Sequence, residues 1–224
     1  MACNIINASI EIMDSPDYTD VLRKIERSGR VCYKSEDRIT PDSAEQFVRS
    51  VIKRGHESVL EHVSLSVRVV CDRGVSHEIV RHRIASYSQE STRYCNYTAG
   101  KFGGHITVID PATGFGWNLD NEADAKKWKI WHSAMYAADL YYSEMIAAGA
   151  TAQEARTVLP NSLKTEIVMT MNLREWRHFF RLRCDKAAHP QMQEVAKMIC
   201  AELVEKCPVF FEDLETVGGE NAKI

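Results

Sequence analysis

A long run of periodic apolar residues between Asn121 and Ala148 constrains the fold of this chain most. An amphipathic helix of that length is about 40 Å long, so it must be a major element of any domain that contains it. Gly149 predicts its C-terminal end. The apolar side chains recur every three or four residues and therefore share one helix face: Trp128, Trp131, Met135, Ala138, Tyr142 and Met145.

A second region has a different period. Apolar and other side chains alternate from His62 to Cys71, a pattern typical of a half-buried strand. Residues 84–97 are polar and carry no regular pattern. Further strands are predicted at 5–13, 106–110 and 165–171. Further helices are predicted at 16–29 (after an N-cap at Ser15), 41–55, 75–83, 152–159, 173–183 and 190–206.

These strands and helices are mixed without a regular alternation, which predicts the α+β class. We expect a single domain over residues 1–224. It should have a mixed or antiparallel sheet flanked by helices, including the long central helix.

Composition excludes several classes of protein. The chain has 224 residues, 45% of them hydrophobic and 26% charged, as in ordinary globular proteins. Its net charge of −3 provides no general attraction for nucleic acid. Its N-terminus lacks the features of a signal peptide, and no apolar stretch approaches the ~20 residues of a membrane helix. We therefore expect no membrane partner and a cytoplasmic protein, in the host cytoplasm if the source is viral.

The seven cysteines also carry information. Their number is odd, their spacing is irregular, and no C-x-x-C motif occurs. This pattern favours reduced thiols over a disulfide framework or a structural zinc site. The segment Gly55–His62 superficially resembles a metalloprotease helix, but its histidines are six residues apart rather than four. We expect no metal there, and instead expect His56 and Glu57 to meet a ligand.

Arginine is concentrated in two segments. Residues 81–94 hold three arginines with only one acid, Glu90, and residues 172–183 hold four more. Two N–H groups of one guanidinium can bind two oxygens of a phosphate at once. This favours small phosphorylated ligands over surface ion pairs, although ion pairs remain an alternative. Arg174 and Arg183 lie on opposite sides of the second helix, so this helix can meet two ligands, or one ligand and another subunit.

Common nucleotide and hydrolase motifs do not occur. The chain contains no G-x-G-x-x-G, no G-x-x-x-x-G-K-[ST] and no G-x-S-x-G. A Rossmann domain, a P-loop NTPase and the commonest serine-hydrolase type are therefore not supported. The residues alone indicate an α+β protein that binds anionic ligands.

One longer pattern is more specific. Arg81-His82-Arg83, followed after seven residues by Ser91 and then by Arg93-Tyr94, resembles the signature of the flavin-dependent thymidylate synthases. Segments 55–62, 154–160, 171–193 and 206–208 resemble the same family in the same order. The resemblance implies reductive methylation of dUMP to dTMP. Methylenetetrahydrofolate would be the carbon donor, and FAD reduced by NADPH would be the hydride donor.

The resemblance also implies residue roles. Arg183 is expected to stabilise negative charge on the uracil, and Ser91 to position and polarise the substrate without acting as a nucleophile. No cysteine and no metal ion has a catalytic role. Flavin contacts are implied for His56, Ser58, Arg81, His82, Arg83, Ile84, Asn172, Arg174, His178, Leu182 and His189. Contacts to dUMP are implied for Glu78, Arg81, Gln89, Ser91, Thr92, Arg93, Arg156 and Arg183.

Members of this family are homotetramers whose active sites form where subunits meet, and we expect the same here. Two rivals remain open. One is a nucleic-acid-binding module that uses the two arginine segments, although the acidic net charge disfavours it. The other is a flavoprotein of the same fold that takes a different pyrimidine nucleotide.

Overall fold

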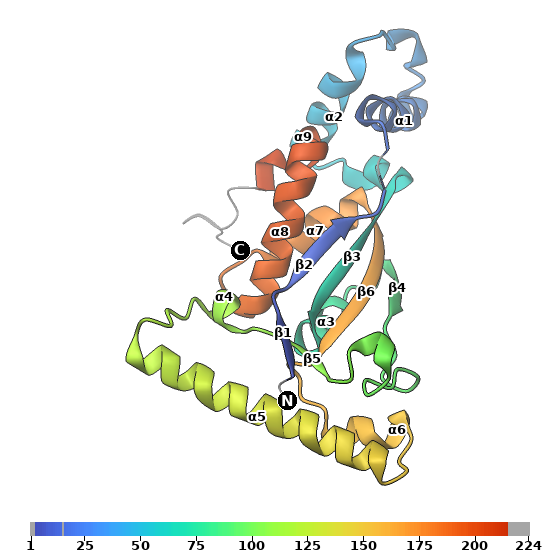
Figure 1. The fold of residues 1–224 in the computed structure, drawn as a ribbon. Coiled ribbons are helices and arrows are strands. Elements are labelled where there is room, and N and C mark those ends of the chain that lie inside the picture. Colours follow the sequence, from blue (N-terminus) through green and yellow to red (C-terminus); the bar gives the residue numbers. More distant parts are fainter. Residues whose placement is uncertain (1–2, 15, 215–224) are drawn as a thin grey trace. The chain divides into compact units, whose positions relative to one another are not determined.

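A computed structural model describes residues 3–14 and 16–214 of the chain (Figure 1). The strands are β1 (Asn4–Ile6), β2 (Ser9–Ile12), β3 (Ser64–Asp72), β4 (Ala85–Gln89), β5 (Thr107–Ile109) and β6 (Lys164–Asn172). The helices are α1 (Tyr18–Arg30), α2 (Ser43–Lys53), α3 (Arg73–Ile79), α4 (Ala112–Phe115), α5 (Glu122–Ala147), α6 (Ala152–Ala155), α7 (Leu173–Arg183), α8 (Pro190–Lys206) and α9 (Pro208–Phe211). Short 3₁₀ segments include η3 (Glu57–His62) and η5 (Arg156–Val158).

The described residues form two compact units. Unit 1 contains the described parts of Met1–Ser9, Val69–Arg81 and Ser88–Ile167. Unit 2 contains those of Ile10–Arg68, His82–Tyr87 and Val168–Ile224. Each unit is therefore assembled from three separate segments of the chain.

The main sheet has the strand order β2-β3-β6-β4 and is antiparallel, which confirms the predicted α+β class. Alternate residues of its two central strands are buried, including Leu65 and Val67 on β3 and Met169 and Met171 on β6. This period of two accounts for the alternation in the sequence. A second, two-stranded sheet pairs β1 with β5 in parallel.

Unit 1 is built around the long helix. Asn121 caps α5 by accepting hydrogen bonds from the backbone of Ala123 and Asp124. One face of the helix buries Met135 and Tyr142 in an apolar cluster with residues of β5 and the segments beside it. The predicted helix of 121–148 is thus confirmed to within a residue at each end.

Unit 2 is held together by aromatic packing around α7. The buried ring of Trp176 stacks on Phe180, which in turn contacts Phe211 edge-on. The indole N–H of Trp176 donates to the backbone carbonyl of Leu65, 3.1 Å away. α7 also packs against α8 (Figure 1). The aromatic residues of α7 are therefore core residues. The charged residues of the helix lie on its other faces.

Some local predictions were wrong. The strand predicted at 5–13 is two strands, β1 and β2. The first helix begins at Tyr18, because Asp17 rather than a preceding residue accepts the capping hydrogen bond from the Asp20 amide. The predicted cap Ser15 lies outside the described residues. The helix predicted at 75–83 ends at Ile79.

The polar segment after α3 contains a strand that the sequence did not predict. β4 is the last strand in the sheet order, and its residues alternate only between half-buried and exposed. An edge strand of this kind has no apolar face and leaves no period-two signal in the sequence. Among the described residues, no helix is both long enough and apolar enough to cross a membrane.

Candidate active site

The segment after β4 carries several of the expected substrate residues, all in unit 1. The chain turns here, and the backbone amides of Tyr94 and Cys95 both donate hydrogen bonds to the carbonyl oxygen of Ser91. Thr92 is buried, while the side chain of Arg93 is exposed. The Arg93 guanidinium donates through Nε to the Gln153 amide oxygen at 2.8 Å and lies over the Tyr94 ring. The Arg93 guanidinium is thus fixed by these contacts and still accessible to solvent.

A second guanidinium belongs to the same neighbourhood. Arg156 begins η5, directly after α6, whose start is fixed by a reciprocal capping box between Thr151 and Glu154. Gln153 and Arg156 are three residues apart, so they lie on the same side of this helical segment. Because Gln153 accepts from Arg93, the fold brings the segment of Arg93 beside that of Arg156, as the resemblance implied.

The one acid in the first arginine segment is not used to neutralise an arginine. Glu90 accepts from Lys164 Nζ and from the Tyr97 hydroxyl, each at 2.8 Å. In the described ranges, no carboxylate makes an ion pair with Arg81, Arg93 or Arg156. These exposed guanidiniums therefore keep their charge available for an anion, which favours the ligand interpretation over surface ion pairs.

Three further substrate candidates also belong to unit 1. The Gln89 side-chain amide donates to the hydroxyls of Ser76 and Thr165, at 2.9 and 3.2 Å, which fixes its orientation. Glu78 is half-buried on α3, and Arg81 is exposed two residues past the end of that helix. Unit 1 therefore holds all the expected dUMP residues except Arg183.

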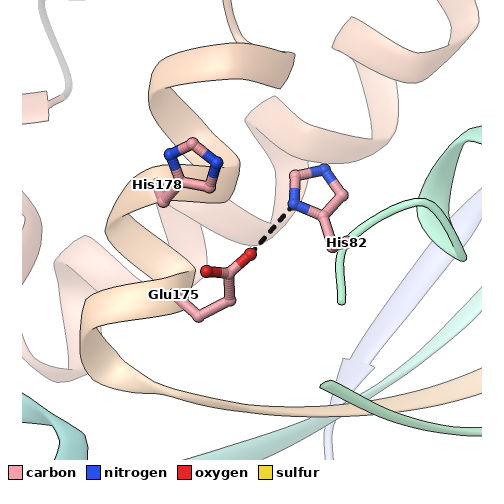
Figure 2. Close-up of side chains that lie close together, drawn as sticks. All are labelled: His82, Glu175 and His178. Atoms are coloured by element: carbon pink, nitrogen blue, oxygen red, sulfur yellow. Dashed lines mark hydrogen bonds and ion pairs between the residues drawn. The ribbon is translucent and has the colours of Figure 1, made fainter. Parts of the chain in front are cut away.

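In unit 2, His82 joins two residues of α7 (Figure 2). Its Nδ1 lies 3.1 Å from Glu175 Oε1, and its Nε2 accepts the Nε–H of Arg183, also at 3.1 Å. Burial lowers the pKa of His82; the Glu175 carboxylate acts in the opposite direction, and the charge of Arg183 lowers the pKa further. The imidazole is therefore neutral, with one nitrogen donating and the other accepting.

His178 completes this group. Its ring contacts the His82 ring edge-on, with centroids 5.9 Å apart. The ligand atoms of His82, Glu175 and His178 lie within 4.8 Å of one another, a spacing that could suit a metal ion. A cation on Nδ1 would, however, move the His82 proton to Nε2, where it would face the Arg183 N–H. We therefore interpret the group as a hydrogen-bonded network, and the absence of a metal stays a prediction.

Unit 2 also contains a cavity of about 1170 Å³, large by the standard of ~300–1,000 Å³ for ligand pockets. Its walls come from α1, α2, η3 and the first turn of α7. His56, Ser58 and Arg174, three of the expected flavin residues, line it together although Arg174 is more than 100 positions away in sequence. Three arginines that the sequence did not single out also line it: Arg30, Arg38 and Arg54.

The cavity is lined by four arginines and one carboxylate, that of Glu57. Arg30 is paired with Glu26, and Arg174 with Glu61, at 2.7 and 2.6 Å. Arg38 and Arg54 make no ion pair with any carboxylate in the part of the chain that the structure describes. A cavity with this set of donors fits the diphosphate of a dinucleotide.

The remaining expected flavin residues have varied environments. The Asn172 side-chain oxygen caps α7 by accepting from the Glu175 amide, at 2.9 Å. Arg83, Ile84, Leu182 and His189 are exposed, with His189 at the start of α8. Nothing in the structure tests these flavin contacts, which stay predictions.

One expectation about η3 was wrong. The Glu57 carboxylate is not free for a ligand, because it accepts hydrogen bonds from Arg177 Nε at 3.0 Å and from Arg181 Nη2 at 2.8 Å. Arg177 is fully buried and also pairs with Asp213. These two arginines of the second cluster therefore hold unit 2 together, and only part of that cluster is left for ligands.

Two kinds of residue were missed in the sequence. The pocket arginines lie among acids in ordinary helical surroundings, so no local signal distinguishes them. Glu175 did carry a signal. It precedes Phe179 by four residues on α7, which places a carboxylate on the same side as a core aromatic residue. A buried acid needs a hydrogen-bond or ion-pair partner, so an acid at this position of the helix predicts that such a partner packs against it.

Comparisons with known proteins show which family this chain is similar to. The sequence profile of the family described as "Thymidylate synthase complementing protein" matches residues 16–209. A "Flavin-dependent thymidylate synthase" of Geobacter sulfurreducens is 33% identical over 193 residues, covering 83% of this chain and 78% of the relative. Proteins of the same description from Mycolicibacterium vanbaalenii and Pyrococcus furiosus are 34% and 33% identical, covering 86% and 77% of this chain and 79% and 68% of each relative.

Proposed function

The chain belongs to the flavin-dependent thymidylate synthase family, and on that premise we propose that it methylates dUMP to dTMP with FAD, NADPH and methylenetetrahydrofolate. The observation that carries the proposal is the arginine-rich cavity of unit 2. The cavity gathers His56, Ser58 and Arg174, which the family resemblance links to the flavin.

The chemistry of the cavity supports a dinucleotide. The guanidiniums of Arg38 and Arg54 provide planar pairs of N–H donors for phosphate oxygens. The Ser58 hydroxyl and the His56 ring add further polar groups. Arg174 lies on the first turn of α7 and Arg183 on its last, so one helix connects the cavity with the His82 network.

The dUMP phosphate and sugar are assigned to unit 1. Arg93 and Arg156 supply positive charge, while Ser91 and Gln89 supply hydrogen bonds. The bonds from Gln89 to Ser76 and Thr165 support this role, because they hold its side chain in one orientation before a ligand arrives.

Methylation of uracil at C5 requires a one-carbon unit and two electrons. Reduced FAD, when bound, supplies the electrons. In our proposal Arg183 stabilises the negative charge that develops on the uracil carbonyl, a role for which a preorganised guanidinium is suited. Ser91 positions the nucleotide. The thiols have no part in the chemistry, which is consistent with the burial of Cys184.

We further propose that the protein is a homotetramer whose active sites lie at subunit interfaces. Support comes from α5, which exposes large apolar side chains. Ile130 is 64% exposed and Tyr141 is 56% exposed. They are eleven residues apart, about three helical turns, and therefore share a face that a second copy could cover.

The first experiment is an absorption spectrum of the purified protein with and without dUMP, together with light scattering to determine its mass. We expect flavin bands that dUMP perturbs, and a tetramer. dTMP should form only when dUMP, NADPH and methylenetetrahydrofolate are all present. Tyr141→Lys should reduce the assembly below a tetramer. Lys129→Glu serves as a control for surface charge, because Lys129 is exposed on α5 but lies about 120° around the helix from Tyr141.

Other outcomes would support the rivals. A colourless protein that binds oligonucleotides with strong salt dependence would favour the nucleic-acid module. A yellow protein whose bands respond to another pyrimidine nucleotide and not to dUMP would favour a different substrate. A monomer with full activity would refute the interface proposal while leaving the reaction intact.

A further inference from the structure

Glu175 is an acidic residue that no motif of the sequence singled out, yet its carboxylate contacts His82 at one end of the His82 network (Figure 2). Its side chain is 10% exposed and that of His82 is 3% exposed. A carboxylate at this depth is costly unless it accepts hydrogen bonds. Glu175 accepts one from a ring that begins 93 positions earlier in the chain.

The direction of the hydrogen bonds follows from Arg183. A guanidinium can only donate, so the His82 nitrogen that receives its Nε–H must carry a lone pair. In a neutral imidazole the proton is then on Nδ1, which donates to Glu175. The network therefore runs in one direction, from Arg183 through His82 to Glu175.

The geometry spans two turns of one helix. Glu175 and Arg183 are eight residues apart on α7, and the ring of His82 bridges them from a different segment. If Nδ1 lost its acceptor, the ring could take the other tautomer and turn an N–H toward Arg183. Two donors would then face each other, and the guanidinium would lose its fixed direction.

The groups around His82 can be named. Glu175, His178 and Arg183 face it from α7, and Tyr87 of β4 donates its hydroxyl to the His82 carbonyl oxygen at 2.9 Å. Of these, only Glu175 provides a negative charge. It accepts the Nδ1–H and so, together with the Arg183 N–H at Nε2, favours the tautomer with the proton on Nδ1.

We propose that Glu175 is a positioning residue for the thymidylate synthase reaction: it fixes the tautomer of His82 and thereby the direction of the Arg183 guanidinium. This inference rests on the role given to Arg183 in the proposed function. Glu175 itself touches neither substrate nor cofactor in this assignment. The same logic orients a catalytic histidine through a carboxylate in hydrolase triads.

The test compares two substitutions. Glu175→Gln keeps a carbonyl acceptor of nearly the same shape and removes the charge, whereas Glu175→Ala removes the acceptor. Glu45→Gln on α2 is the control, because Glu45 is exposed and pairs with Arg49 at the surface. For each variant we would measure flavin content, KM for dUMP, kcat for dTMP formation and the melting temperature.

We expect kcat of Glu175→Ala to fall by about tenfold or more, with flavin content and KM nearly unchanged. Glu175→Gln should recover much of that loss above neutral pH. The Glu175 charge favours protonated His82, so its removal should move the acid limb of the kcat profile to lower pH. Wild-type kcat in Glu175→Ala, or an acid limb that does not move in Glu175→Gln, would overturn the proposal.

A second measurement does not depend on activity. In protein with ¹⁵N-labelled histidine, the ring shifts of His82 report which nitrogen carries the proton. We expect Nδ1–H in the wild type and a mixture of tautomers in Glu175→Ala. Nε2–H in the wild type would overturn the inference even if dTMP forms. The expected tautomer in a protein that makes no dTMP would instead refute the proposed function, and with it the catalytic consequence drawn here.

Discussion

Arg183 donates its Nε–H to Nε2 of His82 across 3.1 Å, although the two residues are 101 positions apart in the chain. His82 comes from the arginine-rich segment after α3 and Arg183 from the end of α7. The two segments that the sequence marked as ligand-binding are thus joined by a direct contact within unit 2. This contact holds the group to which we assign charge stabilisation.

Replacing Arg183 tests that assignment. Arg183→Ala should retain flavin and lose about 3–4 kcal/mol of transition-state stabilisation, because a preorganised donor to the developing charge is gone. The measurement is kcat/KM for dTMP formation beside the flavin spectrum. Arg183→Lys keeps the charge without the planar donor pair and should recover little. Wild-type turnover in Arg183→Ala would contradict the role.

The cavity of unit 2 makes a separate prediction. Arg54→Ala should weaken FAD binding by about tenfold or more, since a hydrogen bond to a charged group contributes ~1.5–3 kcal/mol. Titration of apoprotein with FAD would measure the change. Arg49→Ala is a matched control, because Arg49 lies on α2 and pairs with Glu45 and Glu212 rather than lining the cavity. Equal losses in both variants would argue against the cavity as the flavin site.

The thiols provide a negative prediction. Cys95 packs against the apolar cluster of unit 1, and Cys184 is buried beside Arg183. Cys95→Ala and Cys184→Ala should each keep dUMP-dependent NADPH oxidation within about twofold of the wild type, because free cysteine in such positions acts as a small hydrophobic residue. Complete loss of activity in either correctly folded variant would restore a covalent thiolate mechanism.

Arg177 should matter for stability rather than for turnover. Arg177→Ala should lower the free energy of unfolding by about 3–5 kcal/mol, because it leaves the carboxylate of Glu57 largely buried with less compensation. Urea denaturation followed by fluorescence would measure this. Arg49→Ala, which breaks exposed ion pairs, should cost less than about 1 kcal/mol. A similar small effect for both would show that burial of Arg177 adds nothing.

Glu57 should make stability depend on pH. Burial raises its pKa, but the hydrogen bond from Arg181 and the charge of Arg177 outweigh burial and leave the pKa below its ordinary value. A carboxylate with a lowered folded-state pKa stabilises the fold above its unfolded pKa, and that stability is lost as the pH falls through the folded value. Acid unfolding monitored by circular dichroism should therefore be less steep in Glu57→Gln. An unchanged slope would contradict this account.

Elements with local signals were predicted well. α8 begins at Pro190 and ends at Lys206 as expected, and α7 spans Leu173–Arg183 as expected. In each case a capping residue or proline marks the start, and these signals act over only a few residues. Asn121 did the same for α5. The edge strand β4 has no such signal and was not predicted. The start of α6 was predicted, but no signal in the sequence marked the division of 152–159 into α6 and η5.

The candidate site residues also divide into those with a pattern in the sequence and those without one. The signature residues were found because they form a long pattern, and the neighbourhood of Arg93 and Arg156 agrees with it. Glu175 was missed because its partner His82 is 93 positions away, and the arginines of the cavity were missed because no local pattern marks them as lining one cavity. Which acid meets His82, or which guanidiniums share a cavity, is decided by packing and not by spacing along the chain.

The two compact units have a consequence for how this protein could be divided. Neither is a continuous stretch of sequence, and one of the points at which the chain passes between them lies between Arg81 and His82, inside the signature itself. No single proteolytic cut or gene truncation can release either unit whole. Neither unit can therefore be expressed alone as one continuous fragment of the gene.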